Sequence, residues 1–112
     1  MPYLKIQTNA EVSNKADLLK KLSSAASKGI GKPETYIMTA LSQVDGMTFG
    51  GSSDPSVFLE CKSIGLKADQ TAGLSALLCS FCKEELNVPE DRVYIEFSSA
   101  EGVMWGWNGR TF

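Results

Sequence analysis

The sequence predicts one α+β domain of two layers (α/β), in which a four-stranded sheet carries two helices on one face. The first observation behind this prediction is an internal repeat, because residues 57–112 align without gaps on residues 1–56. The second is the order of each half: an alternating apolar stretch, a helical stripe, a Pro-Glu pair and another apolar stretch. We therefore interpret residues 1–112 as a single domain built from a tandem β-α-β repeat.

The identities between the two halves are spread over the helices, the breaks after them and the last turns. They occur at Ala16/Ala72, Leu18/Leu74, Leu22/Leu78, Ser24/Ser80, Pro33/Pro89, Glu34/Glu90, Ser42/Ser98, Gly46/Gly102 and Gly50/Gly106.

In the first half, residues 2–8 place Leu4 and Ile6 on one face between polar neighbours, which is typical of a strand. Asn14 followed by Asp17 resembles a capping pair at the start of a helix. The apolar stripe of that helix consists of Leu18, Leu22, Ala25 and Ala26. We expect the helix to be stopped by Gly29, Gly31 and Pro33, and a strand to follow over residues 36–44.

The second half repeats this order. Residues 57–64 are expected to form a strand, and residues 92–98 the last long strand. Between them a helix is predicted by the stripe Leu74, Leu77, Leu78, Phe81 and Cys82, and it ends at Asn87 and Pro89. The tail, residues 105–112, is short and aromatic.

The two faces of the predicted sheet have different surroundings. The face under the helices should bury Leu4, Ile6, Val57, Leu59, Val93, Ile95 and Phe97. The opposite face should carry Tyr3, Lys5, Tyr36 or its neighbours, Phe58, Glu60, Ile64, Tyr94 and Glu96. Because this second face is too apolar and aromatic to remain in water, we expect an oligomer that covers it.

The composition excludes several classes of function. The chain has no histidine, so it cannot form a Ser-His-Asp triad, a Cys-His dyad or a His-ligated metal site. Its 11 basic and 13 acidic residues are interspersed, and without a basic block nucleic acid is not an expected partner. No apolar run is long enough to span a membrane.

The N-terminus lacks the basic region and apolar stretch of a signal peptide, so the cytoplasm is the expected compartment. Release without a leader peptide stays open as an alternative. The three cysteines are accordingly expected to be reduced thiols.

Two residues are candidates because of their position. Pro2 would present a secondary amine at the start of a strand if the initiator methionine is removed, but proline also tolerates a first-strand position simply because its missing N–H costs nothing there. Lys32, between Gly31 and Pro33, is either an anion-binding ammonium or a solvated lysine near a helix C-terminus. The residues alone favour the structural interpretation in each case: a proline tolerated at the start of a strand, and a solvated lysine near a helix C-terminus.

Three further segments have simple structural interpretations. Cys79 and Cys82 form a Cys-x-x-Cys motif inside the second helix, so they are expected, like Cys61, to be small core side chains. The Gly-rich segment 49–55 leads into a strand and is interpreted as the turn that joins the halves. The aromatic tail either fills the core or lines a pocket.

A set of short motifs follows in one order along nearly the whole chain: Met1-Pro2, Thr8-Asn9, Gly31-Lys32-Pro33, Tyr36-Ile37, Phe49-Gly50-Gly51-Ser52-Ser53, Ser63-Ile64-Gly65, Asp91-Arg92-Val93-Tyr94 and Gly106-Trp107-Asn108. In this order and spacing they resemble the macrophage migration inhibitory factor family of the tautomerase superfamily. The resemblance implies a homotrimeric tautomerase fold with active sites between subunits. It also implies keto–enol tautomerase activity of the phenylpyruvate or dopachrome type, on small aromatic 2-oxo acids.

The resemblance also implies roles for individual residues. Pro2 matches the family's catalytic N-terminal proline, Lys32 its motif lysine, and Ile64 the residue whose backbone N–H contacts the substrate. Tyr94 matches a pocket tyrosine supplied by the neighbouring subunit. The expected substrate pocket is completed by Tyr36, Glu96, Trp105 and Phe112.

This chemistry suits a chain without histidine. Removing a proton from carbon beside a carbonyl needs a base that is neutral near pH 7. Burial and the Lys32 ammonium should both lower the pKa of the Pro2 amine and so keep it unprotonated. The resemblance implies neither a cofactor nor a metal.

The chain departs from the family pattern at several positions. Glu96 replaces an asparagine of the better-known animal members, and Trp105 replaces a smaller aliphatic residue, so both should narrow the substrate range. The animal Cys-x-x-Cys would fall at Ser56 and Leu59, so thiol-disulfide exchange is not carried over. The alternatives are a cytokine-like binding or signalling protein with weak or vestigial tautomerase activity, and a thiol-disulfide oxidoreductase.

Overall fold

The computed structural model describes residues 1–112 and contains the elements of two β-α-β units in the expected order. The main elements are β1 (Tyr3–Thr8), α1 (Lys15–Ile30), β2 (Met38–Gln43), β3 (Val57–Ile64), α2 (Thr71–Leu86) and β4 (Val93–Ala100). Four short 3₁₀ turns accompany them: η1 (Glu34–Tyr36), η2 (Ala68–Gln70), η3 (Glu90–Arg92) and η4 (Gly102–Met104). The chain ends in a small hairpin of β5 (Gly106–Trp107) and β6 (Arg110–Thr111).

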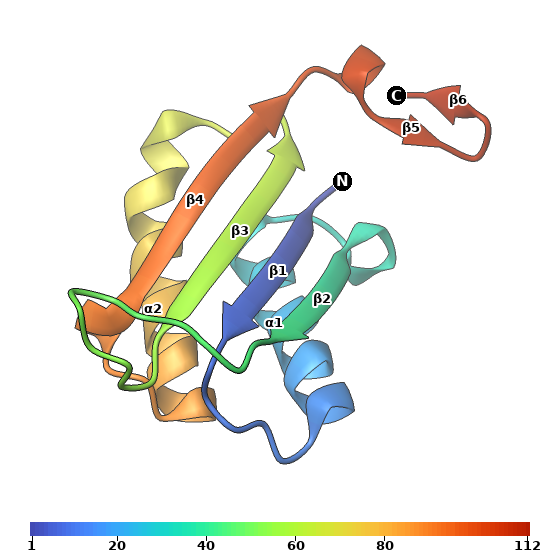
Figure 1. Ribbon diagram of the computed structural model, residues 1–112. Helices are drawn as coiled ribbons and strands as arrows, with labels where there is room; N and C mark the ends of the chain where they lie inside the picture. Colours follow the sequence, from blue (N-terminus) through green and yellow to red (C-terminus); the bar gives the residue numbers. More distant parts are fainter.

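The sheet has the order β2-β1-β3-β4, with both helices on one face (Figure 1). Each β-α-β unit contributes a parallel pair, β1 with β2 and β3 with β4, while β1 and β3 pair antiparallel at the centre. The predicted α+β fold with a four-stranded sheet and two helices on one face is therefore confirmed.

The internal repeat is visible in the helices and their termini. The helices α1 and α2 both have 16 residues and occupy equivalent positions of the two halves, as do the turns η1 and η3. Each helix ends at a residue in the left-handed conformation, Gly31 with φ 79° and Asn87 with φ 55°. Because both residue types tolerate positive φ, the two halves end their helices in the same way with different residues.

The core lies between the helices and the covered face of the sheet. Leu4, Ile6, Val57 and Leu59 are buried as expected, and Cys61 joins them. Ile95 and Phe97 are only partly buried, which corrects the expectation that the whole inner row of β4 is in the core. The reason is that β4 is an edge strand, with a neighbour on one side only.

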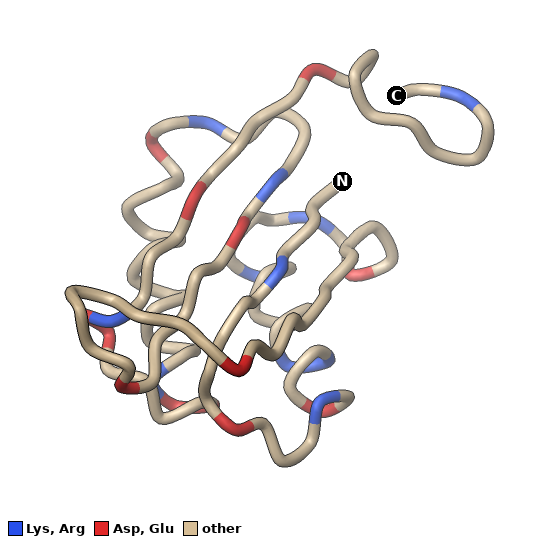
Figure 2. Tube along the Cα trace, viewed as in Figure 1, with Lys and Arg blue, Asp and Glu red and all other residues tan.

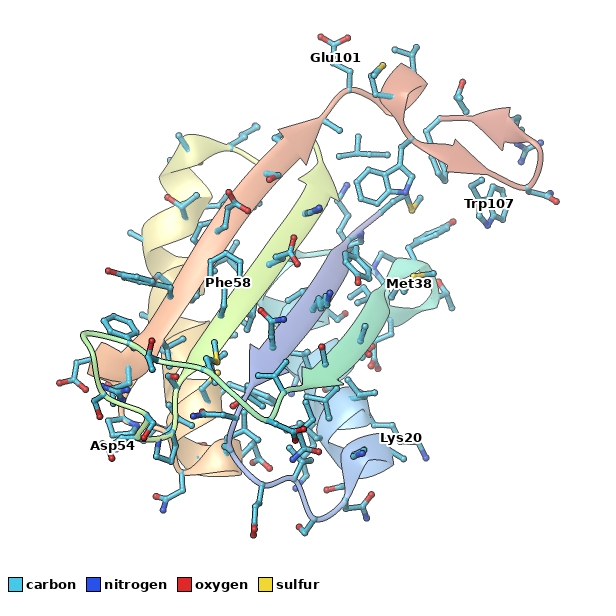
Figure 3. The ribbon with its side chains drawn as sticks, viewed as in Figure 1. Lys20, Met38, Asp54, Phe58, Glu101 and Trp107 are labelled. Atoms are coloured by element: carbon cyan, nitrogen blue, oxygen red, sulfur yellow. The ribbon has the colours of Figure 1, made fainter.

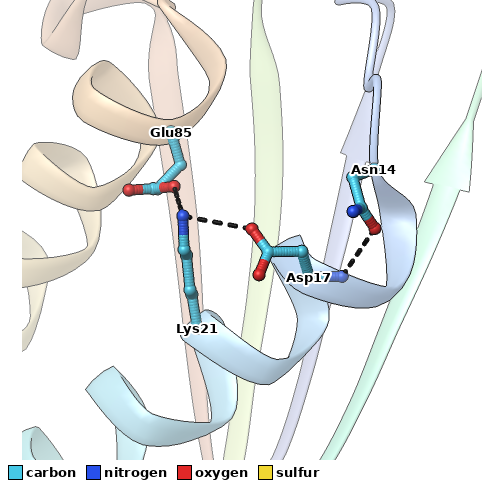
Figure 4. A network of polar contacts seen from close by, with 4 residues as sticks. All are labelled: Asn14, Asp17, Lys21 and Glu85. Atoms are coloured by element: carbon cyan, nitrogen blue, oxygen red, sulfur yellow. Dashed lines mark hydrogen bonds and ion pairs between the residues drawn. The ribbon is translucent and has the colours of Figure 1, made fainter.

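The start of α1 agrees with the sequence prediction. The Asn14 side-chain oxygen accepts a hydrogen bond from the Asp17 N–H at 3.0 Å, which caps the helix. The Lys21 ammonium lies 3.1 Å from both the Asp17 and the Glu85 carboxylates and so bridges α1 to α2 (Figure 4).

The end of α1 differs from the prediction, because the helix continues through Gly29. A Cβ atom at this position would lie 3.0 Å from a methyl group of Leu74. Gly29 is therefore a point of close approach between α1 and α2, and the helix ends at Gly31 instead.

The predicted strand 36–44 begins two residues late, at Met38. After Pro33 the chain forms the turn η1, in which the Tyr36 N–H donates to the Pro33 carbonyl and the Ile37 N–H to the Glu34 carbonyl. Tyr36 therefore lies in η1 and not, as expected, on the sheet. It lines the same cavity as Pro2 and Tyr3 at the N-terminal end of β1.

Charged residues are interspersed along the whole trace, with no block of either sign (Figure 2). None of the helices combines the length and the apolar character that crossing a membrane would require.

Candidate active site

A cavity of about 350 Å³ lies at the N-terminal end of β1. Three separate segments form its walls: the N-terminus, the turn before β2 and the C-terminal hairpin. Its lining includes Pro2, Tyr36, Met38, Trp105, Trp107 and Phe112. The walls are mostly apolar and aromatic, so the cavity suits a small molecule with a planar apolar part.

Pro2 is buried next to this cavity, immediately before β1. Its carbonyl accepts a hydrogen bond from the Met38 N–H at 3.0 Å, which fixes the residue beside the start of β2. With Met1 in place, the Pro2 nitrogen is a tertiary amide and carries no proton. If Met1 is removed, that nitrogen becomes the N-terminal amine.

The electrostatic surroundings favour the neutral form of an amine at this terminus. Burial, and then the positive charge of Lys32, lower the pKa of the Met1 amine below its ordinary value of 8.0. Lys32 is held by the turn after α1, where the Ser27 hydroxyl donates to the Lys32 carbonyl at 2.6 Å.

Lys32 and Ile64 line a second, more polar cavity of about 410 Å³. It is formed by the end of α1, the end of β3 and the turn before α2. Gly65, with φ 68°, lets the chain turn sharply after Ile64, and its N–H donates to the Ala100 carbonyl at 3.1 Å. Lys32 lines the second cavity, but its positive charge also lowers the pKa of the N-terminal amine at the first cavity. Its charge therefore acts at both cavities.

The aromatic tail lines the first cavity rather than filling the core. The Phe112 N–H lies 3.1 Å from the Gly102 carbonyl and 3.2 Å from the Trp105 carbonyl, and the Phe112 ring stacks on Trp107 with centroids 5.7 Å apart. A Cβ atom at Gly102 would lie 2.7 Å from the Phe112 carbonyl oxygen, so glycine is needed for the tail to fold back. These contacts position Trp105 and Phe112 at the cavity.

Tyr94 does not reach this cavity within one chain. It pairs with Phe58, which pairs with Gln7, whereas Pro2 precedes Tyr3 at the other end of β1. Four residues along a strand correspond to about 13 Å. Tyr94 lies instead at the opposite end of the sheet, where it lines a third cavity of about 410 Å³ with its ring 4.5 Å from that of Phe49.

Glu96, two residues further along β4, also lies on the open face and pairs with Glu60 in the sheet. The predicted site residues therefore form two groups in one subunit. Pro2, Tyr36, Trp105 and Phe112 surround the first cavity, with Lys32 and Ile64 beside it. Tyr94 and Glu96 are remote from them.

Four further residues belong to these cavities. The sequence places Tyr3 on the open face and Trp107 in a tail that either fills the core or lines a pocket, but it marks neither Met38 nor Lys67. Tyr3, Met38 and Trp107 line the first cavity, and Lys67 lines the second. Met38 and Trp107 lie on the same side of the molecule, with Asp54 at the opposite end (Figure 3). Trp107 thus follows the pocket-lining alternative for the aromatic tail, whereas nothing in the local sequence marks Met38.

The three cysteines are free thiols and lie against the core. Burial raises the pKa of Cys61 to about 11. Burial, with a smaller effect of Cys79, raises the pKa of Cys82 to about 12. Since the thiolate is the reactive form, Cys61 and Cys82 are poorly suited to thiol-disulfide exchange, and a Cys79–Cys82 pair would need the Cys82 thiolate. No group of three or more Cys, Asp or Glu side chains is gathered closely enough to hold a metal ion.

The comparisons with known proteins agree with the geometry. The model of the family "Macrophage migration inhibitory factor (MIF)" matches residues 1–112. A macrophage migration inhibitory factor homolog from Brugia malayi is 38% identical over 100% of this chain and 99% of its own length. The macrophage migration inhibitory factor of Xenopus tropicalis is 36% identical over the same shares.

Solved structures show the same similarity. The crystal structure of a macrophage migration inhibitory factor homologue from Prochlorococcus marinus superimposes with a TM-score of 0.92 and 40% identity, covering 98% of each chain. The macrophage migration inhibitory factor of Toxoplasma gondii superimposes with a TM-score of 0.89 and 33% identity, covering 98% of this chain and 99% of its own.

Proposed function

This chain belongs to the macrophage migration inhibitory factor family, within the tautomerase superfamily, and from that premise we propose that it is a keto–enol tautomerase. The general base is the amine of Pro2, exposed by removal of Met1. The observation that carries the proposal is the apolar cavity at Pro2, where burial and Lys32 both disfavour a protonated terminal amine.

The reaction follows from these groups. The neutral Pro2 amine takes a proton from the carbon beside the substrate carbonyl, and negative charge develops on the carbonyl oxygen. The Lys32 ammonium stabilises that charge or holds the substrate carboxylate. The protonated Pro2 amine then releases its proton to solvent, and the enolate oxygen takes a proton from solvent, which gives the enol and restores the neutral amine.

The shape and chemistry of the cavities support an aromatic 2-oxo acid such as phenylpyruvate as the substrate. The aromatic ring would lie between Tyr36, Trp105 and Phe112, where burial of apolar surface favours binding. The carboxylate would lie toward Lys32 and the backbone of Ile64. This orientation places the carbon between ring and carbonyl next to Pro2.

We propose a homotrimer with active sites between subunits. Two observations support it: the open face of the sheet presents Tyr3, Phe58 and Tyr94, and the β5–β6 hairpin stands away from the main sheet (Figure 1). In such an assembly Tyr94 and Glu96 of one subunit would complete the site at Pro2 of its neighbour. Three unpaired cysteines suit a reducing compartment, and we propose the cytoplasm.

The processed protein should accelerate phenylpyruvate enolisation, followed by ultraviolet absorbance, well above the buffer rate. Mass spectrometry should find Pro2 as the first residue of the active protein. A folded trimer that begins at Pro2 and does not exceed the buffer rate would contradict the proposal.

The substrate range should widen when the two departing residues are replaced. In the Trp105→Val, Glu96→Asn double variant we expect kcat/KM for a bulkier substrate such as indolepyruvate to rise roughly 10-fold relative to phenylpyruvate, because the pocket is wider and less acidic. Glu101→Gln is the matched control for charge, since Glu101 is exposed after the end of β4 (Figure 3). An unchanged ranking of the two substrates would refute this assignment.

The cysteines should affect stability and not turnover. Replacing Cys79 and Cys82 by alanine is expected to lower the free energy of unfolding by about 1 kcal/mol per residue, because buried atoms are lost from the core. Chemical denaturation measures this loss, and kcat per folded subunit should remain that of the wild type. Loss of turnover with unchanged stability would show that the thiols take part in the reaction.

A further inference from the structure

The segment between β2 and β3, residues 44–56, crosses the end of the sheet where Tyr94 lies (Figure 1). Its tip is a tight turn in which Phe49 and Ser52 exchange backbone hydrogen bonds across Gly50 and Gly51. Both glycines have positive φ, 61° and 78°, which a two-residue hairpin turn of this kind requires. The tip therefore forms a regular two-residue hairpin turn.

One side of this segment is fixed to the end of β1. The Asn9 amide group donates to the Ser53 carbonyl at 3.0 Å, and its side-chain oxygen accepts from the Ser56 N–H at 2.9 Å. Thr8 also donates, from its hydroxyl, to the Ser56 carbonyl at 2.7 Å. These bonds hold the base of the segment but do not reach its tip.

The tip is held by Arg92, the last residue before β4. Its guanidinium donates to four backbone carbonyls: Pro55 at 3.0 Å, Phe49 at 3.3 Å, Ser52 at 3.1 Å and Asp54 at 3.1 Å. The same group lies over the Phe49 ring, 5.5 Å from its centroid. A planar fork with several fixed N–H directions can make this set of bonds, and a lysine ammonium cannot.

The contact continues from Phe49 to Tyr94. The two rings have centroids 4.5 Å apart with their planes inclined by 37°. Arg92 is the last residue of η3 and Tyr94 the second residue of β4, so the two lie close together at the start of this strand. Arg92 thus holds the turn, the turn holds Phe49, and Phe49 packs against a tyrosine that is 63% exposed in the single subunit.

We propose that Arg92 is a positioning residue that acts through Phe49 to orient the Tyr94 ring for the active site of the neighbouring subunit. This inference rests on the proposed function, in which Tyr94 completes that site. Arg92 itself does not touch the substrate. Its role is to hold the Phe49–Pro55 turn in one place, so that Tyr94 presents one orientation when the subunits meet.

The first test observes Tyr94 directly and does not require activity. The three tyrosines, Tyr3, Tyr36 and Tyr94, are labelled with 3-fluorotyrosine, and the ¹⁹F resonance of Tyr94 is assigned with Tyr94→Phe. In Arg92→Lys, which keeps the charge, and in Phe49→Leu, this resonance should shift and broaden. Asn14→Ala is the control for a general loss of stability, because it removes the cap of α1, which is not among the contacts of Arg92, Phe49 and Tyr94, and should leave the resonance in place.

The second test is a double-mutant cycle on kcat/KM for phenylpyruvate. Arg92→Lys should lower kcat/KM by about 10-fold, within the roughly 100-fold that a misplacement of one ångström costs. In the Tyr94→Ala background the same substitution should have no further effect, because the ring that it positions is gone. All variants are compared as folded trimers of confirmed mass.

The outcomes separate the two proposals. A Tyr94 resonance that is unchanged in folded Arg92→Lys trimers would overturn the role of Arg92. The same conclusion would follow if the double variant lost kcat/KM by the product of the two single losses, because the two residues would then act independently. If the wild-type protein has no tautomerase activity, the proposed function fails, and the ¹⁹F spectra alone decide whether Arg92 orients Tyr94.

Discussion

A trimer with one residue retained or added before Pro2 is expected to enolise phenylpyruvate no faster than buffer. An acylated Pro2 nitrogen is a tertiary amide, and its lone pair is not basic. Loss of a positioned general base costs about 10²- to 10⁴-fold by itself. The additional residue would also lie at the cavity beside Pro2, which Met1 lines in the unprocessed chain. Ultraviolet absorbance of the enol measures the rate.

The controls vary the amine without blocking it. Pro2→Gly leaves a primary amine in a similar place and should keep part of the activity. Pro2→Ala should also keep some, although loss of the rigid ring misplaces the nitrogen and can cost on the order of 100-fold. Full activity of the extended trimer would contradict the assignment of Pro2, since no free amine remains at that position.

Two variants that each have little activity should regain activity when they assemble together. One carries the blocked N-terminus with Tyr94 intact, and the other carries a free Pro2 with Tyr94→Ala. If Tyr94 comes from the neighbouring subunit, every mixed cyclic trimer has one site with a free Pro2 beside an intact Tyr94. Co-expressed mixed trimers should therefore show about a third of the wild-type turnover.

This experiment also tests the oligomeric state. Sedimentation equilibrium of each parent variant should give a trimer, which excludes an effect of disassembly. Mixed trimers that are no more active than their parents would show that Tyr94 does not act across the subunit boundary.

The repeat made the fold predictable from the sequence. The two halves place their helices and 3₁₀ turns at equivalent positions, so each half supported the interpretation of the other. The start of α1 was predicted correctly because the Asn14 cap is local, with its bonding partner three residues away. Signals of this short range are readable without knowledge of the fold.

The sequence-based predictions fail where contacts between distant segments determine the local structure. Gly29 is a helix breaker by composition, but it lies inside α1 because Leu74 of α2 packs against it. The β5–β6 hairpin has only two residues per strand, and it depends on the contact of Phe112 with Gly102. Neither contact is visible in the local pattern.

The candidate site was predictable only in part from the residues. The residues alone favoured purely structural interpretations of Pro2 and Lys32, and only the family resemblance implied that they act in a site. The division of the site residues into two remote groups follows from the strand register, which sequence periodicity does not determine. The contacts from Arg92 to Phe49 and from Phe49 to Tyr94 cross about 40 residues of chain and became apparent only in the structure.

The central claim, a neutral Pro2 amine as the general base, is tested most directly by titrating the Pro2 nitrogen. In processed trimers labelled with ¹⁵N-proline, the chemical shift of this nitrogen gives its pKa. We expect a pKa below about 8, the ordinary value for an α-amino group. The rise of kcat/KM with pH should have the same midpoint, because the amine becomes active when it loses its proton. In Lys32→Ala both midpoints should move to higher pH together, since a neighbouring positive charge is removed. A Pro2 nitrogen that titrates at or above about 8, or a kcat/KM profile that does not follow it, would contradict the account.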